Sequence, residues 1–194
     1  MPRPSTKAKR SQQVLSAYLS VAARYGVSGA TLERIAKEAQ MTRPLVRHHL
    51  GNKEDMFDLL VEHVVVELDN QTRQIVDALP NSGRVDALTS YLFGQPKTPG
   101  PQLIYVFADL TMKSVSDAAL AEKLSGTITK FEVMLRHEIR AEFPHASQKN
   151  AHAVAHGIMA IYFNCISLAP LASDTTDARH AVDILIQSLV KSTT

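Results

Sequence analysis

Residues 31–57 read TLERIAKEAQMTRPLVRHHLGNKEDMF, and the caps and apolar residues in this stretch decide the fold of the N-terminal part of the chain. Thr31 is a good N-cap for a short helix whose apolar residues share one face: Leu32, Ile35, Ala36 and Ala39. Gln40 and Met41 then form a turn, and Thr42 caps a second short helix. Two short helices joined by a tight turn predict a helix-turn-helix, which places its second helix in the DNA major groove.

The end of this stretch predicts where the second helix stops and a long one begins. Pro44 fits a first helical turn, although it biases Arg43 away from helical angles and leaves the helix start open by one residue. Gly51 breaks the helix. Asn52 caps the next helix, with Asp55 three residues later as in a capping box.

Helical spacing of apolar residues continues on both sides of this stretch, so the sequence predicts an all-α fold. Upstream, one apolar face ends at Gly26, a plausible C′ residue. Downstream, breaks at 80–83 (PNSG) and 94–101 (GQPKTPGP) separate helices expected near 53–79, 84–93, 101–114, 117–143, 147–169 and 177–191. We expect a basic arm and DNA-binding head over residues 1–52 and a larger helical body over residues 53–194.

Charge is divided unevenly along the 194 residues, although the net charge is only +2. Residues 1–53 hold ten Lys and Arg against two Asp and Glu, whereas the remainder is acidic. A basic head on an acidic body indicates nucleic acid binding at one end. The single Cys165 excludes an intrachain disulfide, and neither a secretion signal nor a run of about 20 apolar residues is evident. We therefore expect a cytoplasmic protein without a membrane partner.

The ordered motifs resemble the N-terminal region of the TetR family of transcriptional repressors over about residues 10–60. The matching elements are an apolar helix ending in Gly26, TLERIA at 31–36, QMT at 40–42, RHHL at 47–50 and NKE at 52–54. Three residues depart from the family pattern: Gln40 stands in place of Gly, Arg47 in place of Tyr and Leu50 in place of Phe. The Tyr that Arg47 replaces usually contacts phosphate, which arginine can also do.

The resemblance implies a ligand-responsive regulator, most often a repressor, that binds a pseudo-palindromic operator as a homodimer. The last two helices form the dimer in this family, and a small molecule binds among helices four to eight. Ligand is expected to shift the long helix 53–79 and so change the spacing of the two heads. The helix around 151–169 is apolar nearly all round, so it must be covered on every side by its own chain or by a partner, and we expect a second copy to cover part of it.

The residues expected to contact duplex DNA lie at helix starts and on the second short helix. Thr31 and Thr42 can bind phosphate while serving as caps, because helix N-termini attract anions. Lys53 opposes the dipole of its own helix, which makes sense if it faces a phosphate. Arg43 is the first choice for reading a base. The remaining candidates are Pro44, Leu45, Arg47, His48 and His49; Val46 and Leu50 are expected in the core.

The candidates for a small, apolar effector are mainly aromatic and Met residues of the body. They are Tyr91, Phe93, Tyr105, Phe107, Met112, Phe131 and Met134, with Asp109 and Asn164 as polar groups that can orient the ligand. Each residue also fits an ordinary core or surface position. The sequence names neither the effector nor the operator.

Enzymatic and metal-dependent functions are not expected. No nucleophile elbow or glycine-rich phosphate loop occurs, and no cofactor is implied. His152 and His156 are spaced to share a metal, but packing histidines are the commoner case and no metal is predicted. The alternatives left open are an all-helical small-molecule-binding protein or enzyme without sequence-specific DNA binding, and a nonspecific DNA binder without a ligand.

Overall fold

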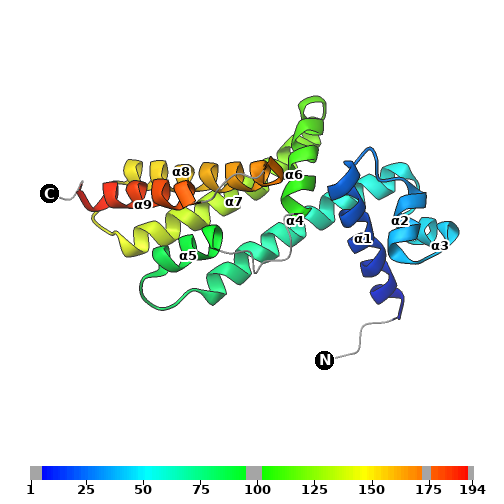
Figure 1. Ribbon diagram of the computed structural model, residues 1–194, viewed down its shortest axis with the longest axis horizontal. Helices are drawn as coiled ribbons and strands as arrows, with labels where there is room; N and C mark the ends of the chain where they lie inside the picture. The colour runs from blue at the N-terminus through cyan, green and yellow to red at the C-terminus, as the bar shows by residue number, and fades with distance from the viewer. Residues whose placement is uncertain (1–5, 95–101, 172–175, 192–194) are drawn as a thin grey trace. The chain divides into compact units, whose positions relative to one another are not determined.

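The structure is a computed structural model that describes residues 6–94, 102–171 and 176–191. These residues form helices and no strand, which confirms the all-α prediction (Figure 1). The elements are α1 Thr6–Tyr25, α2 Leu32–Ala39, α3 Arg43–Leu50, α4 Lys53–Ala78, α5 Arg84–Phe93, α6 Gln102–Lys113, η1 Ser114–Ser116, α7 Ala118–Glu142, α8 Gln148–Leu168, η2 Ala169–Leu171 and α9 Thr176–Lys191. Most of the expected N-terminal arm, residues 1–5, lies outside the described part.

The local signals in the sequence place the helix ends correctly. Gly26 and Gly51 both have positive φ angles, 72° and 77°, where a side chain would be strained. Arg43 is the first residue of α3 despite the proline that follows it, and Thr42 is the extended N-cap residue. The side chain of Thr42 makes no capping hydrogen bond, so its capping role is one of backbone position only.

The chain packs as two compact units, and α4 belongs to both. The first unit holds the described residues up to Leu68 together with those from 102 to Leu124. The second unit holds the described residues from Asp69 onward in α4 and α5, and from Ser125 to the end of α9. The boundary expected between residues 52 and 53 separates a DNA-binding part from a ligand-binding part, and this functional boundary stays a prediction. The packing units are divided differently, since α6 packs with the head.

In the first unit, α1 packs against α2, α3 and α6. Its core is made of small and branched apolar side chains that are fully or almost fully buried, among them Val14, Val21, Ile35, Val46, Leu50, Leu60, Val106 and Leu110. Two polar contacts join α6 to the loop after α1. The carboxylate of Asp109 accepts a hydrogen bond from the Val27 N–H at 2.6 Å, and Lys113 Nζ donates to Ser28 Oγ at 2.7 Å.

In the second unit, α8 runs beside α9, and α5 also packs on α9 (Figure 1). Gly157 is what permits the close approach of α8 and α9, since a Cβ atom there would lie 2.7 Å from Leu185 Cδ1. The core includes Leu88, Leu135, Ile139, Ile158 and Val182, all nearly inaccessible to solvent. Burial of these side chains supplies the main free energy that holds the unit together.

Candidate nucleic-acid interface

The turn between α2 and α3 fixes which face of α3 is presented to solvent. Gln40 adopts left-handed angles (φ 53°, ψ 42°), and its N–H donates to the Lys37 carbonyl at 3.2 Å. Met41 N–H donates to the Ala36 carbonyl at 3.0 Å, which closes the end of α2. Val46 and Leu50 are buried against the head, as the sequence predicts. The opposite side of α3 is therefore free for a partner.

The residues expected to read bases lie on this free side. Arg43, Pro44 and His48 are exposed, and Leu45 is half-buried. Arg43 and Arg47 form no hydrogen bond or ion pair with any residue that the structure describes. Two unpaired guanidinium groups on one short exposed helix have the chemistry needed to bind guanine edges or phosphates.

The residues expected to bind phosphate begin the helices around α3. Thr31 is exposed, and its hydroxyl accepts a hydrogen bond from Arg34 N–H at 3.4 Å. Asn52 Oδ1 accepts from the N–H groups of Glu54 and Asp55, and Asp55 accepts from Asn52 N–H at 2.9 Å. The predicted capping box is thus confirmed. It leaves Lys53 exposed at the first position of α4.

His49 is held inside the head rather than presented freely. Its Nδ1 atom lies 3.0 Å from Ser11 Oγ on α1, and the side chain is half-buried. Gln13 on the same helix donates to the Ala39 carbonyl at 2.9 Å. Sequence reasoning missed Ser11 and Gln13, because nothing in the local pattern links them to residues about 30 positions later. They position α3 and the end of α2 against α1.

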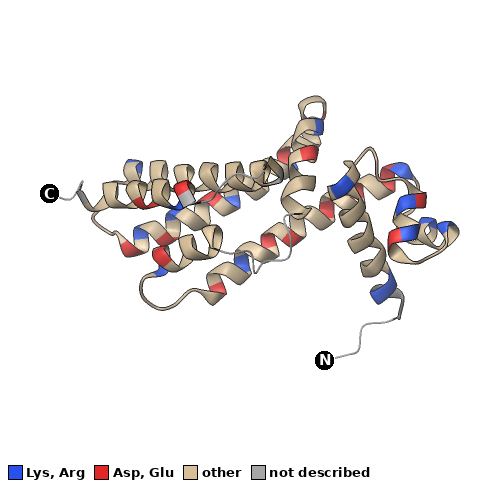
Figure 2. Cartoon of the chain, viewed as in Figure 1, with Lys and Arg blue, Asp and Glu red and all other residues tan. Residues whose placement is uncertain are grey.

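Not every cation of the head is available to a partner. Arg24 pairs with Glu38 at 2.6 Å, while Arg34 donates to the Gly29 carbonyl and stacks over the Tyr25 ring at 4.5 Å. Figure 2 shows Lys and Arg along α1, α2 and α3, with acidic residues among them on α2. Arg43, Arg47 and Lys53 are left unpaired by the described residues on α3 and at the start of α4, and this positive charge favours binding of a polyanion there.

The effector candidates on α6 belong to the first unit. Phe107 is buried, Tyr105 is half-buried and Met112 is 72% exposed. The carboxylate of Asp109, expected to orient a ligand, is engaged by the Val27 N–H. The structure therefore gives Asp109 a packing role within the head, and its role toward a ligand stays untested.

The other candidates lie in the second unit, where an aromatic cluster gathers some of them. Phe93 and Phe131 both contact Tyr162, with ring centroids 6.1 and 5.9 Å apart, and Phe163 joins the cluster through Phe131. Met134 is buried, whereas Tyr91 and Asn164 are exposed.

Sequence reasoning missed Tyr162 and Phe163, although an adjacent aromatic pair within the apolar helix was a usable signal. Burial, with a smaller effect from nearby Tyr91, raises the pKa of Tyr162 to about 12, so its phenol is neutral. A neutral hydroxyl among three phenylalanine rings can donate a hydrogen bond to a ligand that enters the cluster.

His152 and His156 face a carboxylate on α7. His152 Nε2 lies 3.0 Å from Glu132 Oε1, and His156 Nδ1 lies 4.0 Å from the same oxygen. Arg136 donates to His152 Nδ1 at 3.2 Å, which adds a positive charge where a cation would bind. Among the described residues, no group of three or more His, Cys, Asp and Glu is arranged to hold a metal ion.

Comparison with known proteins agrees with this geometry. Residues 14–60 match the family model of bacterial regulatory proteins of the tetR family. The HTH-type transcriptional regulator BetI of Paraburkholderia phymatum is 23% identical over 184 residues, which cover 94% of this chain and 92% of that protein. The matched region contains the turn, α3 and the capped start of α4 described above.

Two solved structures show the same fold. A TetR transcription regulator from Haloarcula marismortui superposes with a TM-score of 0.73 at 15% identity, covering 93% of this chain and 98% of that chain. The multidrug binding protein EbrR, complexed with imidazole, gives a TM-score of 0.57 at 15% identity over 91% and 94% of the two chains. With two arginines on the exposed side of α3 that no described residue pairs, and with residues 14–60 matching the model of the tetR family, the chain is a DNA-binding transcriptional regulator whose N-terminal region is similar to that of the TetR family.

Proposed function

We propose that the protein is a repressor that binds a pseudo-palindromic operator as a homodimer and leaves it when a small apolar molecule binds. The observation that carries this proposal is the two-sided character of α3. Val46 and Leu50 anchor its inner side, and Arg43 and Arg47 stand unpaired on its outer side among the described residues. Such a helix reads only a few bases, so a useful operator needs two of them.

The proposed dimer is supported by α8 and α9. By length and composition, α8 is apolar enough to cross a membrane. Nevertheless, only 28% of its most apolar 18-residue stretch is buried within the protomer. On the same helix pair Leu168 and Ile184 are 40% and 53% exposed. A second copy of the chain would cover these side chains in a four-helix bundle.

The proposed effector site of the body is the aromatic cluster of the second unit. Phe93 and Phe131 line it together with Tyr162, and we assign Tyr91, Met134 and Asn164 to its surroundings. Four further candidates lie on α6 in the first unit, and we propose them separately as ligand contacts: Tyr105, Phe107, Asp109 and Met112. The structure of EbrR with imidazole supports small-molecule binding in this fold, without identifying the ligand of this chain.

The proposed coupling between effector and DNA runs through α4. This helix starts with the phosphate-facing Lys53 in the first unit and ends in the second unit at Ala78. A ligand can release DNA only if it binds the non-binding conformation more tightly. We place the protein in the cytoplasm, where its operator is.

Selection of duplexes from a randomised library tests the proposal. The intact protein should enrich a pseudo-palindrome whose half-sites are about one helical turn, roughly 34–36 Å, apart. Its binding should weaken steeply as salt rises. Equal affinity for all duplexes would instead indicate a nonspecific DNA binder, and no duplex binding at all would refute the proposal.

A further inference from the structure

The first unit has an open cleft whose floor is formed by apolar side chains. Binding to DNA does not require such a floor. Its cavity volume is about 1070 Å³, within reach of a small organic ligand. Buried Val27, Ala30 and Met56 contribute to its lining, as does the half-buried ring of Phe57. A DNA backbone phosphate binds cations and N–H groups and makes no use of an apolar surface. This surface is therefore suited to a different ligand.

The hydroxyl of a largely buried tyrosine also faces this cleft. Tyr18 on α1 is 3% exposed and lines the cleft, and its hydroxyl forms no hydrogen bond with any residue that the structure describes. Burial raises the pKa of Tyr18 to about 12, so the group is a neutral donor. The hydroxyl is not among the fully buried polar atoms that lack a partner, so it opens on the cleft and can donate a hydrogen bond to a ligand oxygen.

The rim of the cleft carries positive charge from three elements. Arg47 comes from α3, Lys53 from the start of α4 and Lys113 from the end of α6. Ser28 Oγ holds the Lys113 ammonium at 2.7 Å, which leaves two of its three hydrogens for a ligand. The N-terminus of α2, at Thr31 and Leu32, opens on the same cleft and also favours an anion.

Three carboxylates at the rim limit how much negative charge a ligand can bring. Asp117 Oδ1 is engaged, since it accepts a hydrogen bond from Leu120 N–H at 3.0 Å at the start of α7. Glu54 and Asp58 are exposed. This balance favours a single anionic group rather than a multiply charged ligand.

We propose that this cleft is a second ligand site, distinct from the aromatic cluster, for a small molecule with an apolar body and one anionic group. The body lies on the floor formed by Val27, Met56 and Phe57, and an oxygen of the ligand accepts from Tyr18. The anionic group binds Lys113 and the neighbouring cations. Because Arg47 and Lys53 are also the proposed phosphate contacts, the occupant competes directly with the DNA backbone; this last step rests on the proposed function.

Binding is tested in the intact protein without DNA. The chain has no tryptophan, so Phe57→Trp gives one fluorescent reporter in the cleft, and Phe93→Trp gives a separate reporter in the aromatic cluster. The probes are 4-phenylbutyrate, decanoate and 2-naphthoate, with 4-phenylbutanol as an uncharged analogue and butyrate as a charge without the body. We expect a saturable change in the Phe57→Trp signal with at least one aromatic or long-chain carboxylate, and weaker binding of both analogues.

Substitutions in the Phe57→Trp background locate the site. Lys113→Met should weaken binding about tenfold and Tyr18→Phe about threefold or more, because each removes a hydrogen bond to the ligand. The matched controls are Lys123→Met, an exposed lysine outside the lining, and Tyr25→Phe on the same helix as Tyr18. Thermal unfolding of each variant shows that the fold is kept.

The proposal is overturned if no carboxylate changes the Phe57→Trp signal saturably at millimolar concentration, if Lys113→Met and Tyr18→Phe bind as the controls do, or if only the Phe93→Trp reporter responds. The last outcome would leave the proposed function intact. In a separate arm, a probe that fills the cleft should lower affinity for the selected duplex in proportion to its occupancy. Unchanged DNA affinity at full occupancy would refute the competition.

Discussion

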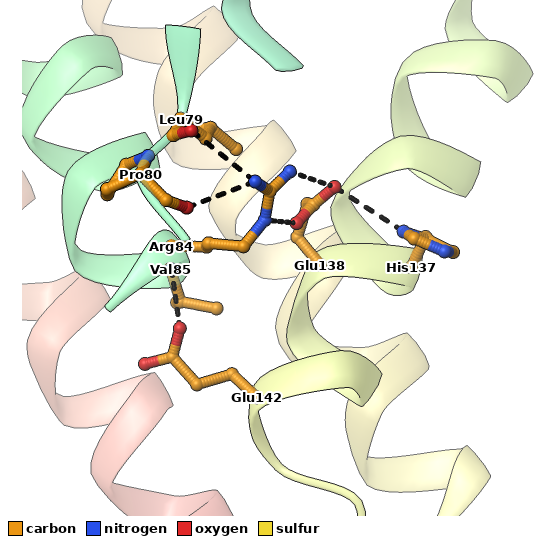
Figure 3. A network of polar contacts seen from close by, with 7 residues as sticks. All are labelled: Leu79, Pro80, Arg84, Val85, His137, Glu138 and Glu142. Carbon is orange, nitrogen blue, oxygen red and sulfur yellow. Dashed lines mark hydrogen bonds and ion pairs between the residues drawn. The ribbon is translucent and has the colours of Figure 1, made fainter. Parts of the chain in front are cut away.

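The guanidinium of Arg84 and the carboxylate of Glu138 form a two-pronged ion pair between α5 and α7, with Nε–Oε2 at 2.6 Å and Nη2–Oε1 at 3.1 Å (Figure 3). Glu138 is only 2% exposed. Arg84 also donates to the Pro80 carbonyl at 3.1 Å, so one side chain ties the turn after α4 to α7. A buried carboxylate in this position depends on its partner, because an unpaired charge away from water is costly.

Arg84→Met should therefore destabilise the protein by about 3 kcal/mol, since it leaves the buried Glu138 carboxylate with only the 3.4 Å contact to His137 Nδ1. Urea unfolding measures this change. Arg179→Met is the matched control, because Arg179 pairs with Asp86 and Asp183, which are 77% and 41% exposed, and exposed pairs contribute at most about 1 kcal/mol each. The double substitution Arg84→Met with Glu138→Met should recover part of the loss. Equal effects of the two arginine substitutions would contradict the interpretation.

Acid should remove the stabilisation that the ion pair of Arg84 and Glu138 provides. The hydrogen bond from Arg84 is the main cause that holds the pKa of Glu138 below its ordinary value, against the opposing effect of burial. The unfolded chain therefore takes up the proton more readily, and the stabilisation is present above pH about 4.5 and lost as pH falls below it. Glu138→Gln should flatten this part of the curve of unfolding free energy against pH. If the unfolding free energy of Glu138→Gln depends on pH as steeply as that of the wild type, other carboxylates cause the acid sensitivity.

Arg43→Ala and Lys53→Ala should weaken DNA binding in different ways. Loss of Arg43 should relax base preference at one position in each half-site, at about 1–3 kcal/mol. Loss of Lys53 should weaken all duplexes alike and reduce the dependence on salt, because a phosphate contact carries no sequence information. Fluorescence anisotropy with selected and random duplexes separates the two effects, and Arg140→Ala, at an exposed position on α7, serves as control. Wild-type binding by both variants would refute the proposed docking.

Gln40→Gly should stabilise the head. Gln40 is the residue with a positive φ among the described non-glycine positions, and left-handed angles cost an L residue about 1 kcal/mol. Thermal unfolding should show a higher midpoint for Gln40→Gly and a lower one for Gln40→Val, whose branched side chain tolerates these angles worst. The opposite order would mean that the Gln40 side chain makes a compensating contact.

Ile184→Glu should weaken the proposed homodimer about 100-fold or more, because it places a charge in the apolar face of α9. Ile184 is 53% exposed in the protomer, so the substitution should leave the protomer folded. Sedimentation over a range of concentrations measures the association. Val133→Glu, at a 47% exposed position on α7, is the control. A wild-type protein that stays monomeric, or a dimer indifferent to Ile184→Glu, would exclude this interface.

Local interactions let much of the head be predicted. The capping pair of Asn52 and Asp55 and the positive φ of Gly51 all act within a few residues, so the sequence pattern alone locates the start of α4. The burial of Val46 and Leu50 follows from their spacing of one helical turn. The same reasoning predicted both ends of α5 correctly.

The sequence by itself determined the helices, the exposed side of α3 and the similarity of the N-terminal region to the TetR family, because caps, breaks and helical periodicity depend on neighbours in the chain. Only the tertiary structure decided which distant groups meet. It brought Asp109 to the Val27 N–H, Glu138 to Arg84, and Tyr18 to a cleft with Lys113. These contacts join residues more than 50 positions apart, and their identity depends on how helices pack, which no local pattern encodes.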